Sequence, residues 1–364
     1  MRSKVNSLKS LPKKITIVEP HPDQLRGHGA HQLAGIKSLL SDHGIYGDDQ
    51  TSLWRHVLTR NPLLIPSLDG SFLPFLIVAS IRALLLQRTV AIWHRPKTST
   101  SGGGPKQYAK YYGAKVINLV PLVALISVQK LQVEPEIAKI CKDWIYQFAQ
   151  WYPPLMTSKR DDEVIAFVEL IRQHANGRPT IIYLGEVTPD KGFGFFTDLL
   201  LEDRFAEFAF VAAGKVSQRS EHAVQRFKKA GGLVVDRYIS DSEFVGGIDI
   251  ADWVWSCYRP DNDQNSGIFG NAYRAGARVI VRSDSYISRV ALDLQFPTVP
   301  IQFGDVRRAL EAIRASRTLM VEKPKQEMIS IMKERTCERL LYYLGCSRVN
   351  RDITPVERTD LSCR

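Results

Sequence analysis

DQNSGIFGNAYRAGARVIVR, residues 263–282, and YLGEVTPDKGFGFF, residues 183–196, are the two stretches that decide the fold. The first places a polar turn before a short helical run that ends at Gly276, and an apolar strand follows. The second runs from a strand through a glycine-containing loop with Lys191 into a helix. Such strand–loop–helix units bring backbone N–H groups and a cation to the carboxyl ends of parallel strands, where α/β sheets bind anionic, nucleotide-like ligands.

The residues around these two stretches repeat the same alternation. We expect helices between successive strands and a helical tail over 305–344; the strands are expected at residues 180–184, 208–213, 232–235, 252–257 and 278–282. Alternation at this spacing predicts a parallel sheet with right-handed crossovers.

The first half opens in a similar way. A short buried strand is expected at 14–19, a turn at Arg26-Gly27-His28-Gly29, and an amphipathic helix over about 30–42. This opening is of the Rossmann type, although the full G-x-G-x-x-G fingerprint is missing. A further strand at 89–93 ends at His94.

The rest of the first half is less regular. We expect a mobile loop over 97–106, a strand at 116–120, an apolar segment at 122–128 and an amphipathic helix over 136–151. The apolar run FLPFLIVASIRALLL, residues 72–86, is too short for a confident membrane span and contains Pro74 and Arg82. It is expected to form a buried or half-buried helix, and a contact with a membrane surface is the alternative.

Length and charge set the broad limits. A chain of 364 residues suits two domains. Residues 1–177 hold 22 basic and 13 acidic side chains, a balance of 22 − 13 = +9, whereas residues 178–364 hold 27 and 25, a balance of +2. The basic first half favours an anionic partner, such as a phosphorylated substrate, an acidic membrane surface or nucleic acid, and plain solubility is the alternative.

The five cysteines show no paired spacing, so the sequence predicts neither a zinc site nor a disulfide framework. The N-terminus, MRSKVNSLKSLPKK, is basic and polar, and no apolar signal core follows it directly. A cytoplasmic protein is the expectation, with association to the cytosolic face of a membrane as an addition to it.

Four segments in order carry a resemblance to a known family. YLGEVTPDKGF, FVAAGKV, VVDRYISDSEF and NSGIFGNAYRAGARVIV resemble, respectively, four segments of the retaining glycosyltransferases of family 4. These are the strand–loop–lysine segment, the glycine-ended strand beneath the donor, the segment at the nucleotide base, and the donor-binding helix with its strand. The first half is similar only weakly, through Gly27-His28-Gly29 and the strand that ends at His94.

The resemblance implies the GT-B fold, in which two Rossmann-like, doubly wound α/β domains face a cleft. Residues 1–160 would form the acceptor-side domain, residues 161–340 the donor-binding domain with a C-terminal crossover helix, and 345–364 a tail. The implied chemistry is a hexosyltransferase-like transfer that retains the anomeric configuration. No cofactor and no metal are expected, because N–H groups and cations stabilise the nucleoside diphosphate that leaves.

Two positions depart from the family pattern. The family carries an arginine, which pairs with the donor diphosphate, where this chain has Glu186. Its paired glutamates, with seven residues between them, fall on Asp263 and Asn271, and an amide lacks the charge-assisted hydrogen bond of a carboxylate. Arg259 and Arg282 are candidates to replace the missing cation.

The candidate residues follow from these segments. The expected donor-binding set is Lys191, Glu186, Arg259, Asp263, Ser266, Gly267 and Asn271. His94 is the catalytic candidate, either binding the transferred sugar or deprotonating an acceptor hydroxyl. Gly27, His28 and Gly29 form an acceptor or phosphate loop. The simpler alternatives are a solvated lysine at Lys191 and an ordinary helix cap at Ser266 and Gly267.

The favoured function is transfer of a sugar from a nucleotide-sugar to a hydroxyl of a glycan or lipid-linked oligosaccharide, in polysaccharide biosynthesis. The alternative is a catalytically degenerate GT-B protein that binds a glycan, a nucleotide or a partner enzyme. Nucleic-acid binding draws only on charge, and no RNA- or DNA-binding motif supports it, so no nucleic-acid partner is expected.

Overall fold

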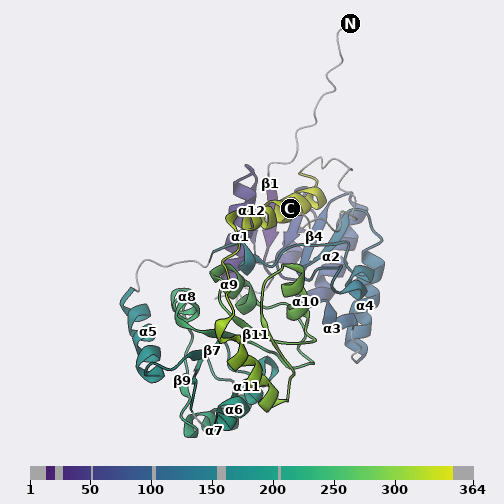
Figure 1. Ribbon diagram of the computed structural model, residues 1–364. Coiled ribbons are helices and arrows are strands. Elements are labelled where there is room, and N and C mark those ends of the chain that lie inside the picture. The colour runs from purple at the N-terminus through teal and green to yellow at the C-terminus, as the bar shows by residue number, and fades with distance from the viewer. Residues whose placement is uncertain are drawn as a thin grey trace.

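The computed structural model describes residues 14–20, 28–50, 52–100, 104–153, 161–203 and 206–346. They form two α/β domains, one above the other in Figure 1, each built on a parallel sheet of six strands. No helix in these ranges is long and apolar enough to cross a membrane.

The N-terminal domain has the strand order β2-β1-β3-β4-β5-β6. Its strands are β1 (Lys14–Val18), β2 (Tyr46–Gln50), β3 (Leu63–Ile65), β4 (Thr89–Trp93), β5 (Val123–Ser127) and β6 (Asp143–Trp144). Its helices are α1 (His28–Ser41), α2 (Phe72–Leu84), α3 (Lys97–Thr100) and α4 (Pro105–Ile117), with the 3-10 turns η2 (Leu53–His56), η3 (Pro135–Lys139) and η4 (Phe148–Gln150).

The C-terminal domain has the order β12-β11-β10-β7-β8-β9. Its strands are β7 (Thr180–Leu184), β8 (Ala209–Ala213), β9 (Leu233–Val235), β10 (Trp253–Ser256), β11 (Val279–Arg282) and β12 (Val299–Ile301). The helices are α5 (Asp161–Ala175), α6 (Phe193–Glu202), α7 (Glu221–Lys229), α8 (Asp241–Ile250), α9 (Gly267–Ala275), α10 (Tyr286–Asp293) and α11 (Val306–Ala315). The predicted alternation of strands and helices in this half is confirmed.

Strand order reverses at one point in each sheet. In the C-terminal sheet the chain winds outward from β7 to β9 and then returns to lay β10 on the other side of β7. In doubly wound sheets the crevice outside the carboxyl ends of the strands at this switch point is the preferred ligand site. The loops after β7 and β10 are therefore the place to look, and they contain most of the predicted donor-binding residues.

Helix α9 joins the two domains by close backbone packing against η4. A Cβ added at Gly270 would lie 2.8 Å from the Cβ of Ala149, so only glycine lets the helix approach this closely. One apolar core cluster runs from Ile126 in the first sheet through Phe148 and Phe269 to Val254 in the second. The carboxyl edges of the two sheets consequently face each other with little freedom to slide.

The last helix, α12 (Gln326–Leu344), returns to the N-terminal domain and lies across it (Figure 1). Arg339 donates a hydrogen bond to the carbonyl of Trp144, and Lys333 forms an ion pair of 2.7 Å with Asp42. The expected single helical tail over 305–344 is wrong in one respect: α11 and α12 are separate helices. Pro324, just ahead of α12, keeps α12 from extending back toward α11, which ends at Ala315.

Three predictions in the first half are wrong. Residues 136–151 form η3, β6 and η4 instead of one helix. Residues 144–151 are buried throughout, because they pass between the domains and are covered on both sides. Residues 116–120 do not form a strand, since α4 continues to Ile117 with Ala114 and Ile117 turned into the core. The expected loop over 97–106 contains α3 and the start of α4, and its residues 101–103 lie outside the described chain.

Candidate functional site

Glycines shape the loops at the switch point of the C-terminal sheet. Gly192 has a φ of 79°, and a Cβ there would lie 2.3 Å from the carbonyl oxygen of Cys257. A Cβ at Gly214 would lie 1.9 Å from the carbonyl oxygen of Gly185, which itself has a φ of 84°. Side chains at these positions would push the loops apart, so glycine keeps the strand ends in close contact.

The loop that carries Lys191 is fixed from the neighbouring strand. The indole nitrogen of Trp255 donates to the carbonyl of Lys191 at 3.1 Å, and the amide of Asn262 donates to the carbonyl of Asp190 at 3.1 Å. A Cβ built on Gly185 would lie 3.5 Å from Lys191 Nζ and 3.9 Å from the side chain of Ile268. The ammonium is therefore held inside the crevice, between the glycine loop and the first turn of α9.

The charge of Lys191 is not neutralised by a neighbour. Burial lowers the pKa of the Lys191 ammonium, the negative charge of Glu186 acts in the opposite direction, and the positive charge of Arg95 lowers the pKa further. No residue of the described ranges forms an ion pair or hydrogen bond with Nζ. Arg95 follows β4 in the N-terminal domain, so cations from both domains act on one point of the crevice.

The amino end of α9 adds N–H donors at the same place. The Ser266 hydroxyl caps the helix by accepting from the N–H of Phe269 at 3.2 Å, and it also contacts the hydroxyl of Tyr258 at 2.8 Å. The N–H groups of Gly267 and Ile268 form no hydrogen bond with a described residue. A helix amino end with free N–H groups beside a desolvated ammonium attracts anions, above all phosphate groups.

Asn271, one turn along α9, presents an unused acceptor. Its amide nitrogen donates to the carbonyl of Gly267 at 2.9 Å, whereas its oxygen is buried and has no partner among the described residues. The side chains of Gln129 and Gln264, which also follow strands at the edge between the domains, contain buried atoms without a partner. Buried polar atoms are normally satisfied, and such a group of exceptions is typical of a ligand site.

Asp263 lies beside this crevice in a network of ion pairs that joins the domains. Its carboxylate accepts from Lys97 Nζ at 2.5 Å, from Arg282 at 2.8 Å and from the N–H of Tyr286 at 2.6 Å. Burial alone would raise the pKa of Asp263. The hydrogen bonds from Lys97 and Tyr286, together with the positive charges of Lys97 and Arg282, outweigh burial and hold this pKa below its usual value. Glu134 adds contacts to Lys97, at 2.7 Å, and to Arg289.

The other predicted donor residues make their contacts away from the Lys191 ammonium. Glu186 is exposed, and its carbonyl accepts from the hydroxyl of Tyr183 at 3.1 Å. Arg259 is exposed and pairs with Asp261 at 3.0 Å. Arg282, the other candidate to replace the missing cation, is occupied by Asp263 and Asp284.

His94 occupies the facing edge of the N-terminal sheet. Its Nε2 lies 2.5 Å from the amide nitrogen of Gln32, which also donates to the carbonyl of Pro66 at 2.9 Å. Nε2 also lies 3.0 Å from the carbonyl oxygen of Pro66, which accepts only from a protonated Nε2. Nδ1 has no partner in the described chain. In the predicted loop, Gly27 lies outside the described residues, and His28 and Gly29 begin α1.

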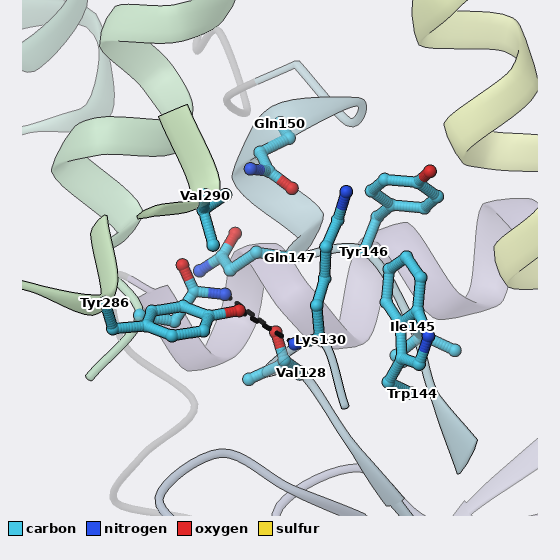
Figure 2. A pocket seen from close by; sticks show the side chains of 10 residues that line it. Val128, Lys130, Trp144, Ile145, Tyr146, Gln147, Gln150, Tyr286 and Val290 are labelled. Carbon is cyan, nitrogen blue, oxygen red and sulfur yellow. Dashed lines mark hydrogen bonds between the residues drawn. The ribbon is translucent and has the colours of Figure 1, made fainter. Parts of the chain in front are cut away.

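A small pocket of about 170 Å³ opens between the domains next to this network (Figure 2). Figure 2 shows Lys130 between Tyr286, whose hydroxyl accepts from the Lys130 N–H at 2.8 Å, and the rings of Trp144 and Tyr146. The Lys130 ammonium lies 5.1 Å and 5.0 Å from the centres of those rings and pairs with Asp293. This space includes open solvent and encloses no room for a small molecule, so we do not assign the nucleotide to it.

Sequence reasoning missed the side chains that reach across the cleft, namely Arg95, Lys97, Lys130 and Glu134. Arg95 had a local signal, because it follows His94 directly at the end of a predicted strand. Lys97 and Glu134 had none, since their partners Asp263 and Arg289 belong to the other domain.

Metal ligands and reactive thiols are not gathered at this site. Within the described ranges, no three His, Cys, Asp or Glu side chains are grouped so that they could hold a metal ion. Cys257 follows β10, and its burial raises the pKa of the thiol.

Comparisons with known proteins agree on the fold. No family model matches the sequence, and no curated protein matches it. HepE (Alr3699) of Anabaena, solved in complex with UDP and glucose, superposes with a TM-score of 0.62 at 13% identity, over 90% of this chain and 99% of that one. Sucrose-phosphate synthase (tll1590) of Thermosynechococcus elongatus gives 0.59 at 11% identity, over 91% and 96%. Trehalose 6-phosphate synthase of Burkholderia multivorans gives 0.52 at 9% identity, over 89% and 83%.

These neighbours are GT-B glycosyltransferases, and this chain has the GT-B fold: two parallel-sheet α/β domains with their carboxyl edges facing. At identities of this size the likeness shows the fold alone. The sequence prediction of this fold is confirmed, and membership of family 4 stays a prediction.

Replacing Lys191 by methionine should stabilise the ligand-free protein and weaken its binding of nucleoside diphosphates. Because the pKa of Lys191 is lowered in the folded state, the unfolded chain binds more protons, and protonation opposes folding. The advantage of Lys191→Met should therefore be largest at neutral pH and vanish as the pH rises past the ordinary lysine value of about 10.4. Urea unfolding at several pH values measures it.

The matched control is Lys215→Met, which removes an exposed lysine that follows β8 at the same edge of the sheet. We expect no change in stability or nucleotide binding from it. A destabilised Lys191→Met protein with unchanged nucleotide affinity would contradict the assignment.

Asp263→Ala should lower the free energy of unfolding by about 3–5 kcal/mol, because it leaves the buried Arg282 guanidinium without its main partner. The pKa of Asp263 is lowered in the folded state, so this contribution is present above the ordinary aspartate value and is lost as the pH falls through the folded pKa. Asp284→Ala, which removes the exposed second partner of Arg282, is the control and should cost much less. Equal losses from both variants would show that the network does not hold the domains.

Proposed function

We propose that this protein is a glycosyltransferase that moves a sugar from a nucleotide-sugar to a hydroxyl acceptor. The observation that carries the proposal is the Lys191 ammonium beside the N–H groups of Gly267 and Ile268 at the sheet's switch point, since none of these three groups has a partner in the described ranges. A diphosphate matches both features. The neighbours with the same fold include HepE, solved with UDP and glucose, which makes nucleotide-sugars the first donors to test.

The donor would lie across the carboxyl edge of the C-terminal sheet. Its diphosphate would contact Lys191 and the first turn of α9, and a ribose hydroxyl would donate to the unused oxygen of Asn271. As the bond between the anomeric carbon and the diphosphate breaks, negative charge grows on the phosphate oxygens. A cation and N–H donors fixed in advance stabilise that charge without reorganising, which is where catalysis of this kind gains most.

A second cation would come from the opposite domain. Glu186 stands where the resemblance calls for an arginine, and its carboxylate would repel a phosphate. Arg95 already acts on Lys191 from the N-terminal domain, and its guanidinium is exposed. Arg95 would therefore supply the charge that Glu186 cannot, and only when the domains are closed.

The acceptor would enter from the N-terminal side, where His94 lies. With Nε2 held between Gln32 and the carbonyl of Pro66, Nδ1 is the ring nitrogen left to contact a sugar hydroxyl. Through Nδ1, His94 would either bind the transferred sugar or take the proton of the acceptor hydroxyl. The closed cleft would exclude water, which would otherwise hydrolyse the donor.

The finer assignments rest on the sequence resemblance. They are family 4 membership, retention of configuration, transfer without a metal or cofactor, a glycan or lipid-linked acceptor in polysaccharide biosynthesis, and action in the cytoplasm at a membrane surface. Lys191, Arg95 and α9 would supply the positive charge that a metal supplies in other transferases. Analysis of the anomer in the product tests retention.

A binding protein without turnover is the second candidate. Glu186 and the amide of Asn271 favour it, since both weaken contacts that the family makes with its donor. Incubation with a panel of nucleotide-sugars, with and without sugar acceptors, separates the two functions. Acceptor-dependent release of nucleoside diphosphate supports the transferase, and nucleotide binding without release supports the binding protein.

His94→Ala should lower turnover on the order of 100–1,000-fold, the usual range for removing one hydrogen bond made in the transition state, with a smaller effect on nucleotide affinity. Steady-state kinetics with calorimetric binding of the nucleoside diphosphate measures both. His222→Ala, at an exposed histidine of α7, is the control and should leave both unchanged. Wild-type turnover in His94→Ala would remove His94 from the mechanism.

A further inference from the structure

The N-terminal domain exposes an apolar face on two adjacent helices. On α2 the exposed residues are Leu73 (67%), Ile77 (43%), Ile81 (37%) and Leu84 (84%), and on α4 with its following turn they are Tyr108 (58%), Tyr112 (60%), Val116 (66%) and Leu119 (80%). Both series have the spacing 4-4-3, which places each on one side of its helix. Together they form a surface that we call the α2–α4 face.

The two helices pack directly on each other, so the two rows form one surface. A Cβ at Gly113 would lie 2.8 Å from a methyl group of Leu76, and Figure 1 shows α2 and α4 side by side at the outer edge of the domain. In Figure 1, α9 lies toward the centre of the molecule, whereas α2 and α4 lie at its right-hand edge.

The inner side of α2 is fixed, so the outer side cannot rotate inward. Phe75 and Val78 are fully buried in the core of the domain. Arg82, also fully buried, donates to the hydroxyl of Thr89 at 3.0 Å and to the carbonyls of His56, Thr59, Asn61 and Arg88 at 2.6–3.1 Å. A helix that is apolar on both sides while only one is covered presents an unsatisfied apolar surface.

The end of α2 extends this surface. Leu85 and Leu86 are exposed, at 46% and 83%, and Leu86 has a φ of 58°, which is unfavourable for a leucine. Trp54 (53%) and Leu58 (75%) lie in and just after η2, which packs against α2. Tryptophan and tyrosine are enriched where a protein meets the polar–apolar boundary of a bilayer.

The segments that form the α2–α4 face carry charge of one sign. Segments 53–60, 72–88 and 105–119 contain no aspartate or glutamate, and their residues Arg55, Arg60, Lys106 and Lys115 are exposed. Beside α4, the exposed Glu136 pairs with Lys139. Apolar and aromatic side chains interspersed with basic ones match an anionic lipid surface, with the apolar side chains entering the boundary of the headgroups and the cations contacting the phosphates.

We propose that the α2–α4 face binds the surface of an anionic lipid bilayer. The bilayer would hold the N-terminal domain by its outer edge and leave the cleft open to soluble nucleotide. This proposal rests on the exposure and the charge of the α2–α4 face, so it does not depend on the transferase proposal.

Sedimentation of the full chain with lipid vesicles tests this. We expect little binding to phosphatidylcholine and strong binding when about a third of it is replaced by phosphatidylglycerol. Leu84→Glu with Leu86→Glu should lower the partition coefficient at least about tenfold, because it places charge where the apolar contact forms. Lys106→Glu with Lys115→Glu should also lower it at least about tenfold, and high salt should weaken wild-type binding.

Two controls carry the same changes on the other domain. Met320→Glu replaces an apolar residue that is 80% exposed, and Lys228→Glu with Lys229→Glu reverses two exposed charges on α7. Both should bind vesicles like the wild type. Failure of the wild type to sediment with anionic vesicles, or undiminished binding by the leucine variant, would overturn the proposal.

Light scattering of the same variants tests whether a second copy of the chain, and not a bilayer, covers the α2–α4 face. A wild-type dimer that the leucine variant converts to a monomer, with vesicle binding absent in both, would show that a second copy covers the face and would overturn the proposal. Release of nucleoside diphosphate from a soluble nucleotide-sugar should be equal in all these variants. This measurement shows whether a negative result contradicts the membrane proposal or the transferase proposal.

Discussion

The Lys191 ammonium, which has no counter-ion in the part of the chain that the structure describes, is the constraint around which the site is built. Lys191 is held under Gly185 by glycine-dependent contacts between the loops after β7 and β10, and burial lowers the pKa of its ammonium. Burying a cation costs free energy unless an anion joins it. Lys191 lies at the switch point of the C-terminal sheet, and the N–H groups of the first turn of α9 lie beside it. The arrangement makes physical sense when an anionic ligand completes it.

The position of α9 depends in turn on the contact between the domains. Gly270 brings α9 against η4, and the network around Asp263 ties α10 and the loop before α9 to Lys97 and Glu134. These contacts hold the carboxyl edges of the two sheets together. They also place Arg95 within electrostatic reach of Lys191, so the positive charge at the crevice belongs to both domains. Loss of the domain contact would therefore reduce the charge available to a diphosphate.

Local chemistry made much of this predictable. Strand ends, glycines and the Ser266 cap are properties of a few consecutive residues, and they located Lys191, Gly267 and Asn271 correctly at one sheet edge. Contacts across the cleft were not predictable, because Lys97 and Asp263 are 166 residues apart. The segment 136–151 failed for a related reason. Its residues 144–151 are covered by both domains, so they are buried without a period that distinguishes a helix from irregular chain.

The most direct test is a crystal structure of the protein soaked with uridine, guanosine or adenosine diphosphate in turn. For the nucleotide that binds, the diphosphate should lie between Lys191 Nζ and the N–H groups of Gly267 and Ile268, with a ribose hydroxyl at Asn271. A nucleotide bound elsewhere, with Lys191 untouched or newly paired with Glu186, would contradict the central claim. So would an empty crevice in all three crystals at saturating nucleotide.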